Sequence, residues 1–120
     1  MINLRVTDVN EKMVKLLKEN NCIAISFGLE SADNKILTSM KKFTTIEQIE
    51  KALKIVNDCK IRIVGNFIFG DIEETIKTAK NTLNWWKENI RYGINLVFIR
   101  TYPGTDIYNM LLKKVWFLMK

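Results

Sequence analysis

Polar side chains follow three of the four apolar, β-branched runs of the sequence. Glu30 and Ser31 come directly after one run, and residues 71–75 (DIEET) come after the next. Tyr102 lies in a TYPGT turn that follows the last run. In α/β proteins the carboxyl ends of parallel strands meet at one edge of the sheet, and ligands bind there. The sequence therefore predicts a ligand site built from these three strand ends.

One amide interrupts the longest apolar run. Residues 61–69 read IRIVGNFIF, and Asn66 stands four positions before Gly70. We expect this run to be a strand buried on both faces, as in a parallel sheet covered by helices. A buried amide without a hydrogen-bond partner costs about 1–3 kcal/mol. Asn66 is therefore expected either to bond a neighbouring strand or to face a ligand.

The residue types present exclude several kinds of catalytic site. The chain has no His, which excludes a Ser-His-Asp triad, a Cys-His pair and an HExxH zinc site. Cys22 and Cys59 by themselves are too few to hold a structural zinc or an iron–sulfur cluster. Because no export signal is evident, we expect both to be small buried thiols, reduced in the cytoplasm.

Length and charge bound the remaining classes of function. The 120 residues suffice for one domain or less, and 48% hydrophobic with 27% charged residues indicates a globular chain. A net charge of +6 permits binding of anions or nucleic acid. The basic residues are scattered, however, and are expected to be solvated helix faces, so nucleic acid is not an expected partner. No apolar run approaches the roughly 20 residues of a membrane helix.

The apolar runs alternate with amphipathic segments. The expected strands are Ile2–Val6, Cys22–Gly28, Ile61–Phe69 and Ile94–Arg100. The expected helices are Asn10–Glu19 (capped by Thr7 or Asp8), Asn34–Met40, a segment from a Thr44…Glu47 or Thr45…Gln48 capping box to Asn57-Asp58, Glu73–Asn89, and Asp106 to the end. This alternation predicts an α/β fold of parallel-stranded (βα) units, with about four strands and four to five helices. Either a complete open sheet or part of a larger barrel fits this order, and the apolar C-terminal end favours the partial barrel.

Four segments together resemble the radical S-adenosylmethionine (SAM) superfamily, in particular its Elp3/MiaB-like, B12-associated branch. They are SFGLES, LTSMKKFTTIEQI, NFIFGDIEET and YPGT, which occur in the family's order and at strand ends. The resemblance covers roughly residues 5–108. It implies that residues 1–120 are a partial core domain, the third to sixth βα units of a partial TIM-like barrel. The sequence departs from the family where DIE replaces LPG, and where LLKKVWFLMK follows Tyr108.

The resemblance also implies cofactors. Family members hold a [4Fe-4S] cluster through a CxxxCxxC motif after the first strand, and SAM bound to this cluster is cleaved to a 5′-deoxyadenosyl radical. That motif is absent from this chain. SAM is thus the expected cofactor, and the [4Fe-4S] cluster is not expected to be ligated by this chain. We expect the isolated chain to be inactive.

The implied cofactor-binding residues are Glu30, Ser31, Lys42, Asn66, Glu74 and Tyr102. By resemblance, Glu30 accepts hydrogen bonds from the SAM ammonium or ribose hydroxyls, and Lys42 lies near the methionine carboxylate. Asn66 occupies a polar position that the family points at the ribose. The alternatives are a helix N-terminal acid for Glu30, a solvated lysine for Lys42, and helix capping for Glu74.

Two other hypotheses remain open at this point. A separate cluster-bearing chain, the missing N-terminal half-barrel, could complete this one, or the chain could be a non-catalytic basic βα module that binds nucleotide or nucleic acid. The second is disfavoured because there is no GxGxxG, no GxxxxGK[ST] and no basic-aromatic cluster. In each case a half-barrel leaves bare strand edges, which predicts self-association.

Overall fold

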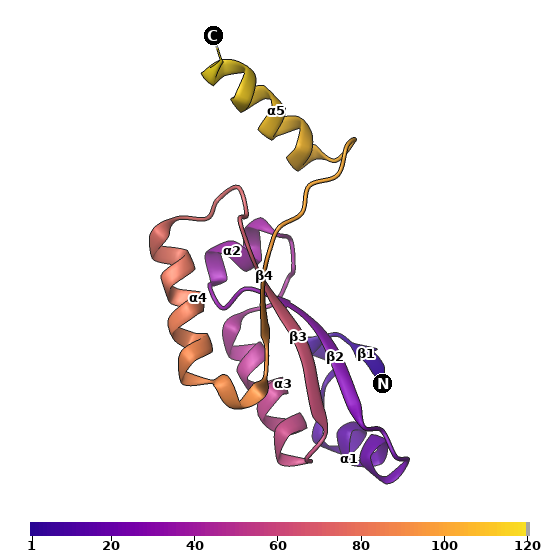
Figure 1. Ribbon diagram of the computed structural model, residues 1–120. Helices are drawn as coiled ribbons and strands as arrows, with labels where there is room; N and C mark the ends of the chain where they lie inside the picture. Colours follow the sequence, from indigo (N-terminus) through magenta and orange to yellow (C-terminus); the bar gives the residue numbers. More distant parts are fainter. Residues whose placement is uncertain (120) are drawn as a thin grey trace.

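The computed structural model describes residues 1–119 and alternates strands with helices (Figure 1). The strands are β1 (Ile2–Leu4), β2 (Ala24–Glu30), β3 (Arg62–Phe69) and β4 (Asn95–Phe98). The α-helices are α1 (Glu11–Glu19), α2 (Asn34–Ser39), α3 (Ile46–Asp58), α4 (Ile76–Glu88) and α5 (Asp106–Leu118), and two 3-10 helices are η1 (Val6–Asp8) and η2 (Ile90–Tyr92). The predicted end of the last helix at Lys120 lies outside the described residues.

The strands form one parallel sheet in the order β1-β2-β3-β4. Each strand therefore pairs with the next one along the chain, after a helical connection. This arrangement confirms the predicted α/β class with parallel (βα) units. It also brings the carboxyl ends of all four strands to the same edge of the sheet.

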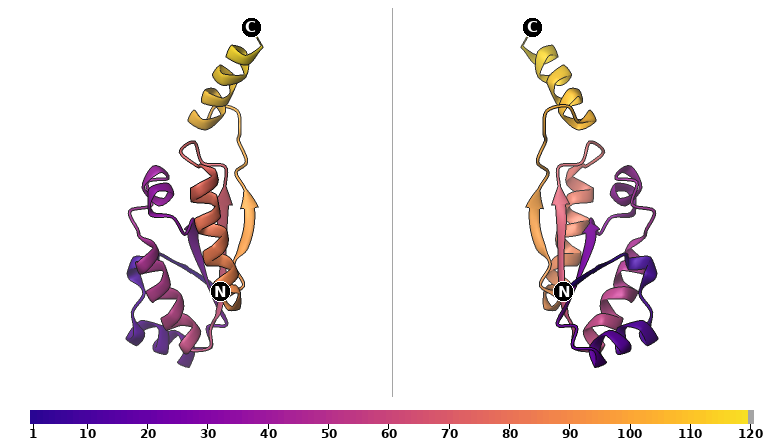
Figure 2. Two further views of the ribbon diagram at one scale, coloured as in Figure 1. Left: turned by 90° about the vertical axis from the view of Figure 1, so that its left-hand side faces the viewer. Right: turned by 90° about the vertical axis from the view of Figure 1, so that its right-hand side faces the viewer.

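The helices α1 to α4 cover only one face of the sheet, as Figure 2 shows. In β3, Ile63 and Phe67 are buried against these helices, whereas Arg62 and Asn66 on the opposite face are exposed. The prediction that this strand is buried on both faces is wrong, because no second layer covers the open face within the described chain. Helices on one side only are the expected arrangement in the wall of a (βα) barrel.

The core lies between α3 and the central strands. Ile49, Leu53 and Val56 of α3 are fully buried, as are Ile25 of β2 and Phe67 of β3. These three α3 residues follow one another at intervals of four and three positions, the spacing of one apolar helix face. Full burial of each such side chain contributes about 1.5–3 kcal/mol, so the packing of α3 on the sheet stabilises the fold.

Helix caps confirm some predicted boundaries and correct others. The Thr45…Gln48 capping box is present, since the Thr45 hydroxyl accepts from the Gln48 N–H and the Gln48 side chain accepts from the Thr45 N–H. Helix α1 is capped by Asn10, whose side chain accepts from the Met13 N–H at 2.9 Å, and not by Thr7 or Asp8.

Helix α4 begins later than predicted. Thr75 is its N-cap and accepts a hydrogen bond from the Thr78 N–H at 3.2 Å. The acidic residues 73 and 74 therefore lie in the turn before the helix and not in its first turn. Strands β1 and β4 are also shorter than expected, ending at Leu4 and Phe98.

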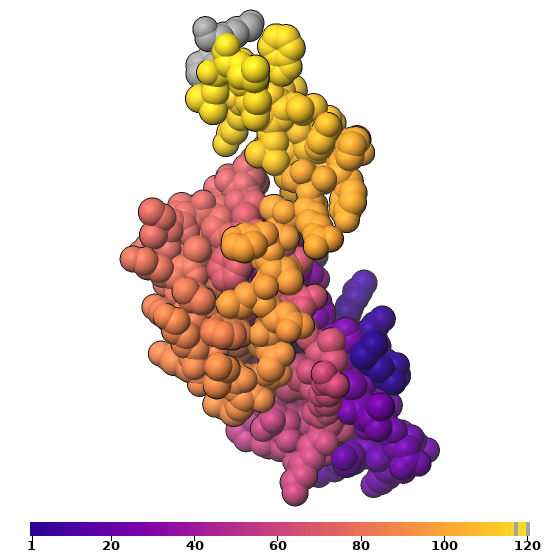
Figure 3. All heavy atoms as spheres, viewed as in Figure 1, coloured from indigo at the N-terminus to yellow at the C-terminus, as the bar shows by residue number. Residues whose placement is uncertain are grey.

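Helix α5 extends away from the sheet instead of packing on it (Figure 3). The molecule measures 61 × 29 × 21 Å along its principal axes. The outer side of β4, where a following helix packs in a regular (βα) unit, is poorly covered: Phe98 is 82% exposed. Helix α5 itself exposes apolar side chains, among them Leu111, Leu112 and Val115. Strand β4 is thus an open, apolar sheet edge.

We propose that the isolated chain self-associates through the β4 edge. The β4 backbone pairs with β3 on one side only, and bare edges with apolar neighbours favour pairing with another chain. Sedimentation velocity is expected to show oligomers whose share rises with concentration. The double substitution Leu96→Lys and Phe98→Lys places charge on this edge and is expected to shift the distribution toward monomer.

The matched control is Leu16→Lys, which changes an exposed apolar residue on α1 and should leave the oligomers unchanged. A single monomeric species of the unmodified chain over the whole concentration range, with a cooperative thermal melt, would contradict self-association.

Candidate functional site

A pocket of about 410 Å³ lies at the carboxyl ends of β1 and β2. Three segments form it: the end of β1 with η1, the open face of β2 at Gly28, and the loop that joins α2 to α3. Its lining residues are Leu4, Arg5, Val6, Thr7, Gly28, Lys41, Lys42, Phe43 and Thr44. This is the edge of the sheet where the sequence predicts a ligand site.

An ion pair stands beside this pocket. Lys42 Nζ lies 3.2 Å from Glu30 Oε1, and the two side chains are 31% and 20% exposed. Gly28 leaves the space for this pair, because a Cβ there would lie 3.0 Å from the Lys42 Nζ and 3.2 Å from the Glu30 Oε1. The structure thus brings together two of the predicted cofactor-binding residues, although they are twelve positions apart in the chain.

Left-handed backbone conformations position both charged groups. Glu30 has a φ of 66°, and the neighbours of Lys42 have φ values of 54° (Lys41) and 52° (Phe43). Lys41 follows the end of α2. Its backbone conformation is explained by helix termination, since its N–H donates to the Thr38 carbonyl. Glu30 and Phe43 follow no helix end. Such conformations in non-glycine residues cost about 1–3 kcal/mol and concentrate at binding sites.

An irregularity in β2 lies directly before Glu30. The register with β3 shifts between Gly28 and Glu30, and Leu29 between them is fully buried under the helices. Ser31 then also turns into the helix layer, where its Oγ lies 3.0 Å from the Thr82 Oγ1 of α4. Ser31 is 1% exposed, so the structure places it away from the pocket. Its position as a cofactor ligand stays a prediction.

Asn66 forms the strand-to-strand bond that the sequence leaves as one of two alternatives. Its Oδ1 accepts from Asn95 Nδ2 of β4 at 3.2 Å, and both amides lie on the open face of the sheet. Asn66 is also in register with Gly28 of β2. The sequence does not single out Asn95, because only the pairing of β3 with β4 makes it the partner of Asn66.

The loop after β3 uses its acidic residues locally. Glu74 Oε2 accepts from the Gly70 N–H at 2.6 Å, which closes the turn. Asp71, 8% exposed, accepts from the Ser39 hydroxyl at 2.6 Å and from the Glu73 N–H at 3.0 Å. Glu74 therefore closes the loop before α4 and does not cap the helix, whose N-cap is Thr75, so the helix-capping alternative for Glu74 is wrong. Tyr102 is 62% exposed in the segment that leads to α5, and it does not line the pocket.

The residues present do not fit an iron–sulfur cluster. Within residues 1–119, no three His, Cys, Asp or Glu side chains are grouped so that they could hold a metal ion. Cys22 and Cys59 are free thiols, and each precedes a strand at the edge opposite the pocket. The sequence predicts both to be buried, and both are partly buried and pack against the core. No described helix is long and apolar enough to cross a membrane.

Two glycines on adjacent strands test this geometry. A Cβ on Gly28 would meet only the ends of two flexible side chains, whereas a Cβ on Gly65 would lie 2.8 Å from Leu29 Cδ1 in the core. We expect Gly65→Ala to lower the free energy of unfolding by about 1–3 kcal/mol through overpacking. Gly28→Ala is expected to leave it nearly unchanged. Urea unfolding of both variants measures this difference, and equal losses would contradict the geometry.

Comparison with known proteins places these features in a family. The model of the radical SAM superfamily matches residues 1–86. An uncharacterized methyltransferase of Pyrococcus horikoshii is 33% identical over 93% of this chain and 26% of its own length. The anaerobic magnesium-protoporphyrin IX monomethyl ester cyclase of Rubrivivax gelatinosus is 32% identical over 95% of this chain and 21% of its own length. The chain thus spans about a quarter of these relatives.

Solved structures share the fold. The cobalamin-dependent S-adenosylmethionine radical enzyme OxsB superposes with a TM-score of 0.66 and 25% identity, over 70% of this chain and 13% of that enzyme. Coproporphyrinogen III oxidase from Escherichia coli, a radical SAM enzyme, superposes with a TM-score of 0.70 and 12% identity, over 98% of this chain and 31% of that enzyme. The family match over residues 1–86, together with this fold, shows that the chain belongs to the radical SAM superfamily.

Proposed function

We propose that this chain forms part of the SAM-binding wall of a radical SAM enzyme. The observation that carries the proposal is the Glu30–Lys42 ion pair beside the pocket at the carboxyl ends of β1 and β2. An α-amino acid carries one ammonium and one carboxylate on the same carbon. A site that holds one carboxylate and one ammonium within 3.2 Å of each other has the complementary pattern.

Binding of the methionine part of SAM would exchange one ion pair for two. Glu30 would accept from the ligand ammonium, and Lys42 would donate to the ligand carboxylate. Neither charge is left unpaired before or after binding, so opening the pair avoids the large penalty of an isolated, partly buried charge. Both side chains retain some exposure, 20% and 31%, which gives the ligand access to them.

The open face of the sheet continues this surface. Asn66 lies beside Gly28 in the paired strands, and its amide NH₂ is not used in the bond to Asn95. An amide at this position can bond a ribose hydroxyl, which supports the role that the family resemblance implies. The SAM cofactor, when bound to a [4Fe-4S] cluster, supplies the radical chemistry of this family.

We further infer that the cluster ligands belong to polypeptide outside these 120 residues. That polypeptide is either another part of a longer protein or a separate chain that completes the barrel. The names of the relatives include a methyltransferase and a cyclase, and those activities belong to proteins about four times as long. We propose a related reaction, in the cytoplasm, for the complete enzyme, with substrate contacts made outside this chain.

Pairing of Glu30 and Lys42 with the ammonium and carboxylate of SAM predicts a specific pattern of SAM binding. Equilibrium dialysis with labelled SAM is expected to show affinity that falls about tenfold in Lys42→Gln and in Glu30→Gln, because each loses one charge-assisted hydrogen bond. The double substitution Glu30→Lys and Lys42→Glu keeps an ion pair but inverts its direction, and it is expected to abolish binding. The matched control is Lys51→Gln, which removes an exposed positive charge of α3 that does not line the pocket and makes no ion pair among the described residues.

Circular dichroism of each variant separates a binding defect from misfolding. Unchanged SAM affinity in the inverted double variant, with its fold retained, would refute the pairing of Glu30 and Lys42 with SAM. A loss in Lys51→Gln as large as in Lys42→Gln would indicate general attraction by positive charge instead of a directed contact.

The absence of cluster ligands from the sequence gives a separate prediction. Anaerobic reconstitution of the chain with iron and sulfide is expected to yield no stable [4Fe-4S] cluster, because two cysteines cannot supply its thiolates. Iron content and the thiolate–iron absorbance bands measure this. The double variant Cys22→Ser and Cys59→Ser sets the baseline, and a stoichiometric cluster on the unmodified chain that this variant lacks would overturn the prediction.

A further inference from the structure

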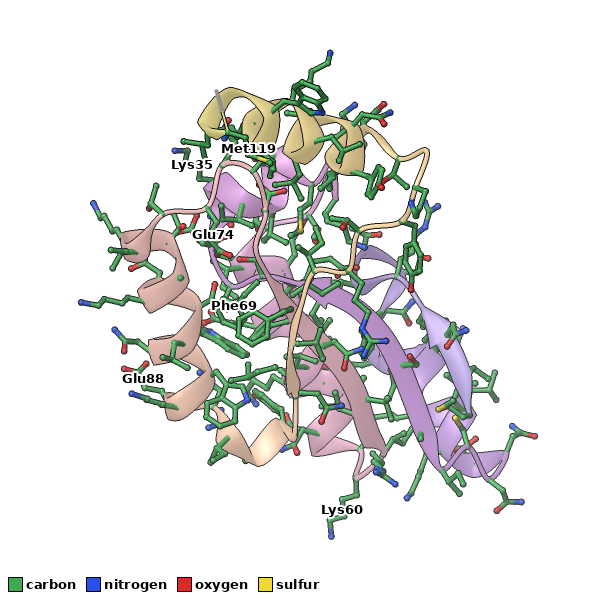
Figure 4. The ribbon with its side chains drawn as sticks, turned by 45° about the horizontal axis from the view of Figure 1, so that its top comes forward. Lys35, Lys60, Phe69, Glu74, Glu88 and Met119 are labelled. Atoms are coloured by element: carbon green, nitrogen blue, oxygen red, sulfur yellow. The ribbon has the colours of Figure 1, made fainter. Side chains whose placement is uncertain are left out.

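A second pocket lies at the opposite edge of the sheet, where β3 and β4 begin. Lys60, two positions before β3 begins, marks the edge in Figure 4, far from Glu74 at the other end. The pocket has a volume of about 270 Å³ and is lined by Asn57, Ile61, Arg62, Ile63, Arg91, Tyr92 and Gly93. It shares no residue with the pocket beside Glu30 and Lys42.

Packed aromatic side chains support Arg91, one of the two arginines of this pocket. The Arg91 Cζ lies 4.6 Å from the centroid of the Tyr92 ring, and Arg91 Nη2 donates to the Tyr92 hydroxyl at 3.2 Å. The Tyr92 ring is stacked on Trp85 with centroids 6.3 Å apart, and Trp85 meets Phe67 edge-on at 5.5 Å. Tyr92 is only 7% exposed. This support restricts the guanidinium and leaves its other N–H groups available.

The positive charge in this pocket is not neutralised by the protein. Among the described residues, no carboxylate lies within 4.0 Å of Arg62 or Arg91. Asp58 follows the pocket residue Asn57, but its carboxylate is held by Lys54 at 2.7 Å. The hydrogen bond from Lys54 to Asp58 and the charge of Asp58 raise the pKa of Lys54, in keeping with this pairing.

We propose that this pocket binds a small dianionic oxyanion, with Arg62 and Arg91 as its charged ligands. Guanidinium groups match the two oxygens of a phosphate or carboxylate, and two of them suit a ligand with two negative charges. The Asn57 amide and the Tyr92 hydroxyl add neutral polar groups to the lining. A volume of about 270 Å³ is below the usual range for drug-sized ligands, which favours a small anion.

Equilibrium dialysis of the full chain at constant ionic strength tests the proposal. Labelled inorganic phosphate at mildly alkaline pH, where it is a dianion, is the first probe, and pyrophosphate and malonate compete with it to distinguish phosphate from dicarboxylate ligands. Arg91→Gln and Arg62→Gln are each expected to weaken binding about tenfold, through loss of charge-assisted hydrogen bonds. Arg91→Lys keeps the charge but not the planar fork, and it is expected to weaken binding nearly as much.

The matched control is Lys77→Gln, which removes one positive charge from the first turns of α4, away from this edge. Equal weakening in Lys77→Gln and Arg91→Gln, or no binding of any probe, would overturn the proposal. The backbone amide signal of Gly93 supplies a local readout: a shift on adding inorganic phosphate that disappears in Arg91→Gln supports the site. Because both arginines are exposed, the variants are expected to fold, and circular dichroism checks this.

Discussion

The residues of β2 and β3 alternate between a face that packs under helices and a face that stays open. Ile25 and Phe67 are fully buried on the packed face, and each such side chain contributes about 1.5–3 kcal/mol. Exposed ion pairs contribute about 0–1 kcal/mol, so apolar packing and not surface charge sets the orientation of these strands. Once that orientation is set, the period of two directs Gly28 and Asn66 to the open face. The candidate site follows from this placement.

The alternation of buried and open positions along β2 is interrupted at the candidate site. Leu29 is buried and the register with β3 shifts beside it, so Glu30 can approach Lys42 while Ser31 turns to Thr82. The left-handed backbone of Glu30 accompanies this interruption. A conformation with an intrinsic cost persists here because the buried Leu29 and the Ser31–Thr82 contact hold the chain on both sides.

The two edges of the sheet differ in their electrostatics. At the carboxyl edge, Glu30 and Lys42 neutralise each other, which suits a zwitterionic ligand. At the amino edge, Arg62 and Arg91 lie at a pocket without a carboxylate partner among the described residues, which suits an anion. The aromatic support of Arg91 ends at Phe67 in the core, so the packing that forms the sheet also holds this guanidinium in place. Both pockets therefore depend on the same layer of helices.

The sequence by itself determined the order of strands and helices and the family, and it narrowed the capping box of α3 to two alternatives, of which the structure contains Thr45…Gln48. These features depend on local periodicity, on hydrogen bonds within one helical turn and on short segments that can be compared directly. It also named Glu30 and Lys42. Only the tertiary structure decided that the two form an ion pair, that Asn66 bonds Asn95, and that one face of the sheet stays open. Those outcomes depend on strand register and on how layers pack, which join residues that no local pattern relates.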